Sequence, residues 1–221
     1  MKLSVIIPTL EAGDCLSATL RALEAADEVL VIDGGSRDHT QAVALAAGAR
    51  FVSTTPGRGH QLMTGGELAH GPWLLFLHAD TILDPGWRDE VARFIAMSEH
   101  GQMAAVFRFA LNDPLPAARR LERWVDRRVR HLGLAYGDQG LLIHRDFYRS
   151  LGGYRPLPLM EDVDLVRRIG RRRLALLNAK ATTSPQRWQR DGWLRRSALN
   201  LGCLSLYFLG VSPSVLKRLY G

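Results

Sequence analysis

The sequence is poor in the features that stabilise secreted domains or anchor membrane proteins. It has two cysteines, Cys15 and Cys203, and neither belongs to a paired-cysteine motif. We therefore expect neither a disulfide framework nor a zinc site, and a reducing, cytoplasmic location is the simplest. The apolar run at residues 3–7 is too short for the core of a signal peptide. The apolar stretch at residues 199–211 is shorter than the roughly 20 residues that a membrane-spanning helix needs.

Lysine is scarce, since 26 of the 29 basic residues are arginine. The charge is also uneven: residues 1–110 carry 8 basic and 13 acidic side chains, and residues 111–221 carry 21 and 9. Because guanidinium suits phosphate and carboxylate, the second half favours a phosphate-bearing partner or peripheral contact with an anionic membrane. Solvated helix faces explain this composition equally well. Nucleic acid is not an expected partner, because the arginine clusters lack the interleaved aromatics of a stacking platform.

A glycine-rich phosphate loop is missing after the first apolar run. Residues 8–11 read Pro-Thr-Leu-Glu, and the pair Gly34-Gly35 follows the second run instead. A dinucleotide fold would need G-x-G-x-x-G after the first strand, and a nucleotidyltransferase would need a glycine-rich basic loop there. Any phosphate must therefore be bound in another way.

Apolar runs alternate with helical patterns in the first half. The runs are nearly continuous, as is typical of parallel strands that are buried on both faces. The alternation predicts an α/β fold with a doubly wound, mostly parallel sheet and helices on both faces. The predicted strands are residues 3–7, 28–32, 50–53 and 73–77, and the predicted helices are residues 16–23, 41–47 and 60–69.

The second half has a less regular pattern. No internal repeat or low-complexity linker separates it from the first half, so we predict a single domain, residues 1–221. Within it, residues 1–110 would bind a nucleotide, and residues 111–221 would bind an acceptor and end in a helical tail. The predicted strands here are residues 103–111, 140–144 and 174–178, and the predicted helices before the tail are residues 116–131, 145–151 and 161–170.

Acidic side chains follow three of the predicted strands. Glu11, Asp33 and Asp80 come shortly after the first, second and fourth strands. Ligands of open α/β sheets bind beyond the carboxyl ends of the strands, so these acids are expected at one crevice. A divalent cation or the donor groups of a nucleoside would relieve their repulsion. Asp80 is the candidate metal ligand, because Mg²⁺ and Mn²⁺ prefer carboxylate and phosphate oxygens. Each acid alone is equally typical of a turn or a helix cap.

Six stretches, in this order and spacing, resemble family 2 of the glycosyltransferases. They are residues 4–9, 31–40, 57–59, 77–80, 152–154 and 161–162. The resemblance implies the GT-A fold and transfer of a sugar from a nucleotide diphosphate donor to a hydroxyl acceptor, with inversion and with Mn²⁺ or Mg²⁺. A narrower likeness is to the small bacterial glycosyltransferases labelled arsenosugar biosynthesis type; residues 77–81, 137–140, 158–163 and 207–211 carry it.

The resemblance also implies roles for individual residues. Arg58 would lie near the diphosphate, Asp80 would bind the metal, and Asp162 would be the catalytic base. The nucleoside pocket would be lined by Pro8, Thr9, Glu11 and Asp33. The family's metal motif is commonly Asp-x-Asp, whereas this chain has His78-Ala79-Asp80. A neutral His78 could replace the first acid by hydrogen-bonding a ribose hydroxyl, or it could merely cap the strand.

Chemistry supports a role for the Glu161-Asp162 pair independently of the family. A sugar hydroxyl becomes a good nucleophile when a carboxylate takes its proton, and a metal stabilises the departing diphosphate. The same acids would also suit the first turn of a helix. We expect Asp138, Gln139 and Glu161 to contact the acceptor, although the first two could simply begin a strand.

A rival hypothesis is a non-catalytic anion- or membrane-binding module on a decayed transferase fold. The replacement of an acid by His78 favours decay, and the intact Asp33, Asp80 and Asp162 argue against it.

Overall fold

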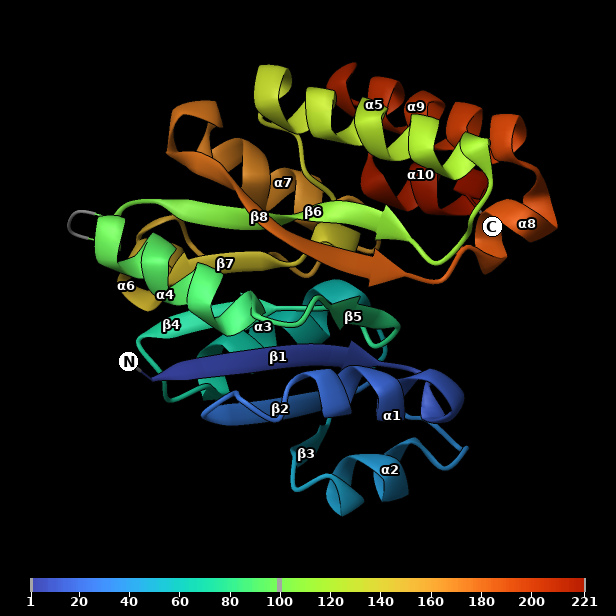
Figure 1. Cartoon of the computed structure of the whole chain (residues 1–221). Coiled ribbons are helices and arrows are strands. Elements are labelled where there is room, and N and C mark those ends of the chain that lie inside the picture. The colour runs from blue at the N-terminus through green and yellow to red at the C-terminus, as the bar shows by residue number, and fades with distance from the viewer. Residues whose placement is uncertain (1, 99–100, 221) are drawn as a thin grey trace.

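The structure, a computed structural model, describes residues 2–98 and 101–220. Its centre is an eight-stranded sheet in the order β3-β2-β1-β4-β7-β6-β8-β5. The first four strands of the chain are mutually parallel and form one end of this sheet (Figure 1). They are β1 (Leu3–Thr9), β2 (Glu28–Asp33), β3 (Arg50–Ser53) and β4 (Trp73–Phe76). Every residue of β1 is buried, which explains its almost continuous apolar sequence.

The other four strands make the sheet mixed. β7 runs antiparallel to both β4 and β6, β8 runs parallel to β6, and β5 runs antiparallel to β8. These strands are β5 (Thr81–Leu83), β6 (Ala104–Leu111), β7 (Leu141–His144) and β8 (Leu174–Thr183). The predicted α/β fold is confirmed, with parallel pairing among β1, β2, β3 and β4 and mixed pairing in the rest of the sheet.

Helices cover both faces of the sheet, and each face has its own apolar core. Ile6 and Phe76 point into one core, whereas Val5 and Leu75 point into the other, as alternation along a strand requires. The second core contains side chains of α1 (Gly13–Ala22), α2 (Thr40–Ala46) and α4 (Trp87–Met97). The first contains side chains of α3 (Arg58–Leu68), α5 (Pro116–Leu132), α6 (Arg145–Ser150) and α7 (Glu161–Ile169).

The C-terminal tail folds back onto the start of α7. It consists of α8 (Gln186–Asp191), α9 (Trp193–Phe208) and α10 (Pro213–Tyr220). Cys203, Leu204 and Leu216 of the tail form a third apolar core with Met160 and Val163, which flank the predicted catalytic acid in sequence. Within the two described ranges, no helix is both long and apolar enough to cross a membrane.

Candidate functional site

The carboxyl end of β2 holds Asp33 in a dense set of hydrogen bonds. Its Oδ1 accepts from the hydroxyls of Thr9 (2.9 Å) and Ser36 (2.6 Å), and its Oδ2 accepts from the N–H groups of Gly35 (2.8 Å) and Ser36 (2.7 Å). Burial by itself would raise the pKa of Asp33, but these donors hold the pKa below its ordinary value. The residue is 2% exposed. Asp33 therefore organises its loop, and its predicted contact with the nucleoside stays a prediction.

The other predicted nucleotide contacts do line one continuous depression, which we call the groove. Its walls include Pro8, Thr9, Glu11, Arg58, His78 and Asp80. Sequence reasoning missed Gln61, a buried residue of α3 that also lines the groove. Its Nε2 donates to the carbonyls of Thr9 (2.6 Å) and Ile32 (2.8 Å), and so ties the ends of β1 and β2 to α3.

A tight turn after β4 presents Asp80. The Thr19 hydroxyl of α1 donates to the carbonyl of Ala79 (2.7 Å), and the N–H of Thr81 donates to the carbonyl of His78 (3.3 Å). These contacts fix the turn from both sides. Asp80 is half-buried and borders both the groove and a second depression, the inner cavity, which Asp138, Asp162 and Arg196 also line.

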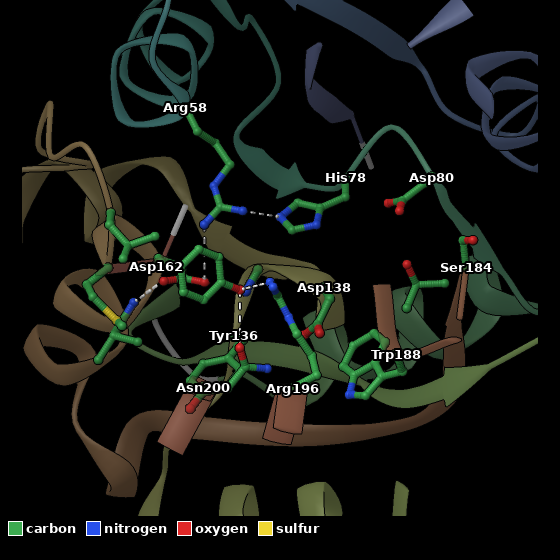
Figure 2. A pocket seen from close by; sticks show the side chains of 16 residues that line it. Arg58, His78, Asp80, Tyr136, Asp138, Asp162, Ser184, Trp188, Arg196 and Asn200 are labelled. Atoms are coloured by element: carbon green, nitrogen blue, oxygen red, sulfur yellow. Dashed lines mark hydrogen bonds and ion pairs between the residues drawn. The ribbon is translucent and has the colours of Figure 1, made fainter. Parts of the chain in front are cut away.

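Arg58 connects the two halves of the chain (Figure 2). Its Nε donates to Glu161 in an ion pair, its Nη2 lies 3.9 Å from Oδ2 of Asp162, and its Nη1 lies 3.4 Å from Nε2 of His78. Gly59 makes this approach possible, because a Cβ there would lie only 2.6 Å from the carbonyl oxygen of Arg155. Arg58, which the sequence predicts to lie near the diphosphate, thus contacts both Glu161 and Asp162.

The two acids of that pair have different surroundings. Glu161 is 1% exposed and does not border the inner cavity; burial raises its pKa, Arg58 opposes the rise, and Asp162 adds to it. Glu161 is therefore the buried partner of Arg58, and its predicted contact with the acceptor stays a prediction. Asp162 does border the cavity. Its Oδ2 accepts from the N–H of Gly137, and its Oδ1 accepts from the N–H of Val163, both at 2.7 Å.

Gly137 is a second position where a Cβ would meet a neighbouring side chain closely. A Cβ there would lie 2.6 Å from Nε2 of His78 and 3.4 Å from Oδ2 of Asp162. The absence of a side chain lets the backbone N–H reach the Asp162 carboxylate. Gly137 thus orients the acid that the sequence predicted to be the base.

Asp138 and Gln139, which are neighbours in sequence, point in different directions. Gln139 is 0% exposed; its Nε2 donates to the carbonyl of Phe107 (3.0 Å), and its Oε1 accepts from Arg128 (3.5 Å). Gln139 thus bonds within the fold, and its contact with an acceptor stays a prediction. Arg128, on α5, is itself buried, with its guanidinium carbon 3.7 Å from the centre of the Tyr136 ring.

Asp138 borders the inner cavity, and its Oδ1 is buried without a hydrogen-bond partner in the described part of the chain. Burial raises the pKa of Asp138 to about 6, against the influence of Arg128 and with a contribution from Asp162. A buried carboxylate oxygen without a hydrogen bond lowers the stability of the folded protein. A ligand that donates a hydrogen bond to this oxygen would remove that cost.

The far wall of the inner cavity comes from the tail and was not predicted. It includes Trp188, Arg196, Asn200 and Tyr220. Figure 2 shows Arg196 and Asp138 across the open space from His78 and Asp80. No local sequence signal marks Arg196, Asn200 or Tyr220, because their proximity to Asp162 depends on how the tail packs.

The donor set at Asp80 fits a metal that is shared with a phosphate ligand. Among the described residues, no group of three or more His, Cys, Asp or Glu side chains could hold a metal without other ligands. Mg²⁺ commonly uses one or two carboxylates together with substrate phosphates and water, so it needs no such group. Asp80, where the groove meets the inner cavity, satisfies that requirement.

Comparison with known proteins gives a family match and more distant relatives. The model of the family described as "Glycosyl transferase family 2" matches residues 4–150. A glucosyl-3-phosphoglycerate synthase of Mycolicibacterium paratuberculosis is 31% identical over 94 residues, which are 36% of this chain and 29% of that protein. An uncharacterized glycosyltransferase of Mycobacterium tuberculosis is 34% identical over 84 residues, 38% of each chain. The matches thus span less than two fifths of either relative.

Solved structures support the same fold. The crystal structure of glucosyl-3-phosphoglycerate synthase from Mycobacterium tuberculosis with Mn²⁺, UDP and glucosyl-3-phosphoglycerate has a TM-score of 0.60 at 21% identity, covering 81% of this chain and 70% of that one. The structure of the same enzyme with Mg²⁺ and UDP has a TM-score of 0.60 at 22% identity, and the match covers 81% of this chain and 69% of that one. These relatives do not carry the arsenosugar label, so that narrower likeness stays a prediction.

Proposed function

The chain belongs to glycosyl transferase family 2, and from this premise we propose that it transfers a sugar from a nucleoside diphosphate donor to an acceptor hydroxyl. One observation carries the proposal: the groove and the inner cavity share a wall formed by Arg58, His78 and Asp80. A donor in the groove and an acceptor in the cavity would therefore meet at this wall. Residues 1–110 supply most of the groove, and residues 111–221 supply most of the cavity.

The donor would lie along the groove. Pro8, Thr9 and Glu11 would contact the nucleoside, and Arg58 and Asp80 would face the diphosphate. UDP is the nucleotide in the solved relatives, so it is the first probe to use. His78 accepts a hydrogen bond from Arg58 if its Nε2 is unprotonated, and its ring borders both spaces, next to the expected position of the donor sugar.

Asp80 would hold Mn²⁺ or Mg²⁺, which when bound supplies positive charge to the leaving diphosphate. Arg58 adds a second positive charge at the same wall. Its ion pair with Glu161 keeps the guanidinium oriented in the absence of donor. Both groups act on charge that develops during transfer, which is where preorganised charge is most effective.

Asp162 would act as the general base. The acceptor oxygen would bond to the anomeric carbon as the bond from that carbon to the diphosphate oxygen breaks, and the hydroxyl proton would pass to Asp162. The N–H donors of Gly137 and Val163 fix the carboxylate, while Asp138 Oδ1 would accept a further hydrogen bond from the acceptor. One base opposite one leaving group corresponds to a single displacement with inversion.

Titration of UDP into the protein with and without Mn²⁺ tests the donor site. We expect Mn²⁺ to tighten UDP binding by about tenfold or more, a difference of about 1.4 kcal/mol, and Asp80→Ala to remove this effect. Asp89→Ala, an exposed acid in the first turn of α4, is the matched control and should behave like the wild type. An Asp80→Ala variant that keeps the Mn²⁺ effect would refute the assigned role. UDP-glucose consumption by the wild type tests turnover.

We also propose peripheral contact between the tail and an anionic membrane. Leu201 and Phe208 on α9, Leu209 just after it, and Leu219 on α10 are exposed apolar side chains. Exposed basic residues lie near them in sequence or in space, namely Arg167, Arg195, Lys217 and Arg218. Exposed apolar side chains surrounded by basic residues are typical of segments that bind at the surface of an anionic membrane.

A further inference from the structure

The inner cavity has a buried cation beyond the part of the chain that the family model matches. Arg196 is 5% exposed, belongs to α9, and borders the cavity that contains Asp138 and Asp162. The family model matches residues 4–150, so Arg196 lies outside the matched part of the chain. Figure 2 shows the Arg196 side chain rising between Asn200 and Asp138 into the space beside Asp162.

The contacts of Arg196 hold it in one orientation. Its Nη1 donates to Oδ2 of Asp191 (3.2 Å), its Nη2 donates to the hydroxyl of Tyr220, and its guanidinium carbon lies 4.4 Å from the centre of the Tyr220 ring. The Tyr220 hydroxyl in turn donates to Oδ1 of Asn200 (3.2 Å). Because α8, α9 and α10 all contribute, the guanidinium is preorganised by the packed tail.

Arg196 shares its carboxylate partner, Asp191, with a second arginine. Asp191 also accepts from Nε (2.8 Å) and Nη2 (3.4 Å) of Arg190, so one carboxylate serves two guanidinium groups. A buried charge with an incomplete counter-charge is costly, and an anionic ligand would offset that cost. Lys217 borders the adjoining groove and adds positive charge on the same side.

We propose that Arg196 binds an anionic group, a phosphate or a carboxylate, on the acceptor itself. The acceptor's hydroxyl would then lie near Asp138 and Asp162, a few ångströms from its charged group. This corresponds to a small phosphorylated polyol or a hydroxy acid. Guanidinium is well suited to such groups, because its planar fork can donate two parallel hydrogen bonds. The inference rests on the proposed function, since it names the acceptor class for the same site.

Three small probes test the proposal: glycerol, which is neutral, glycerate, which adds a carboxylate, and glycerol 3-phosphate, which adds a phosphate. Each is titrated calorimetrically into the wild type, with and without UDP and Mn²⁺. We expect at least one anionic probe to bind about tenfold or more tightly than glycerol. Binding of glycerol 3-phosphate alone would identify a phosphate site, and comparable binding of glycerate would identify a site for either anion. Equal binding of all three probes would overturn the proposal.

Matched variants assign the effect to Arg196. Arg196→Gln should lose the preference for the anion, whereas Arg195→Gln, which removes the same charge from the exposed neighbouring position, should keep it. Arg196→Lys keeps the charge without the planar fork and should bind the anion about threefold or more weakly than the wild type. Anion binding by Arg196→Lys that equals the wild type would overturn the proposal even if Arg196→Gln did not fold.

Titration of UDP separates this proposal from the broader one. All folded variants should bind UDP with Mn²⁺ as the wild type does, because Arg196 does not border the groove. A wild type that binds the anionic probe but neither binds UDP nor consumes UDP-glucose would contradict the proposed transferase function and leave the anion site intact.

Discussion

Two backbone N–H groups donate to Asp162, one to each carboxylate oxygen, and such bonds restrict the rotation of the carboxylate. If Asp162 accepts the acceptor's proton, Asp162→Asn should reduce turnover by roughly 10²- to 10⁴-fold while UDP binding is retained. The measurement is UDP-sugar turnover beside UDP affinity. Asp164→Asn is the matched control: it removes a buried acid from the same helical turn, one that pairs with Arg155 and Arg168. The Asp164→Asn variant should lose stability but keep most of its turnover. Near-normal turnover of Asp162→Asn would contradict the role of Asp162 as the base.

Asp138 allows a prediction about pH. Its pKa is raised from 3.8 to about 6, so the charged form is disfavoured in the folded protein. Below the pKa that Asp138 has in the unfolded chain, its carboxyl is protonated in both states and does not oppose folding. As the pH rises through the higher pKa of the folded state, the buried carboxylate must ionise and the folded protein loses stability. Asp138→Asn cannot ionise and should therefore be more stable than the wild type by about 1–3 kcal/mol near pH 7.5, and by little near pH 4.

Urea unfolding at the two pH values measures this difference. The same variant should bind the acceptor more weakly, because the buried Oδ1 no longer carries charge. A stability difference independent of pH would mean that Asp138 does not titrate as described.

The sequence singled out candidate site residues but did not indicate which way their side chains point. Arg58, Asp80 and Asp162, whose roles at the diphosphate and the acceptor stay predictions, all border the inner cavity. Asp33 and Gln139 turn inward instead. Both follow or begin short polar segments, and a polar residue there can serve either the ligand or its own loop. Only the position of its donors and acceptors in three dimensions decides between these possibilities.

At the scale of whole elements, the limits of prediction have two different causes. β5 has three residues, and its strand character comes from pairing with β8, for example Thr81 with Thr183, about a hundred residues away. No local pattern reveals such a strand. The helix α4 is different, since buried Trp87 and Val91 lie four residues apart and Asp89 and Glu90 occupy its first turn. That helix has recognisable sequence signals and was missed.

The position of α3 depends on Gly59. A Cβ at this residue would lie 2.6 Å from the carbonyl oxygen of Arg155 and 2.7 Å from that of Leu157, both backbone atoms that cannot rotate away. Gly59→Ala should therefore destabilise the fold by about 1–3 kcal/mol and displace Arg58 from Glu161. The free energy of unfolding, from urea titration, measures the first effect, and UDP affinity reports the second.

Gly202→Ala provides the matched control for that substitution. Gly202 lies on an exposed position of α9, and a Cβ there meets nothing within 4 Å. Alanine in a helix is favoured over glycine by about 1 kcal/mol, so this variant should be slightly more stable than the wild type. If both substitutions changed stability equally, the close approach at Gly59 would not be what positions α3.

At the scale of the whole molecule, charge and exposed apolar side chains coincide in the second half. Residues 111–221 have a net charge of +12, and the first half is net negative. The tail helices that carry the exposed leucines lie at the end of the sheet opposite β3 and α2 (Figure 1). A membrane that binds this end would leave β3 and α2 directed away from the lipid.

Leu209 is the most informative residue for testing that orientation, because it is 80% exposed at the end of α9. Wild-type protein should co-sediment with vesicles containing phosphatidylglycerol at low salt and dissociate near 1 M salt, where the Debye length falls to about 3 Å. Leu209→Asp adds a negative charge and removes apolar contact, so it should weaken vesicle binding by about tenfold or more. Leu45→Asp makes the same change at a 55% exposed position on α2 and should leave binding unchanged. Equal loss of binding in both variants would show that net charge alone drives the association, because a tail that docks through its own surface must distinguish the two ends of the molecule.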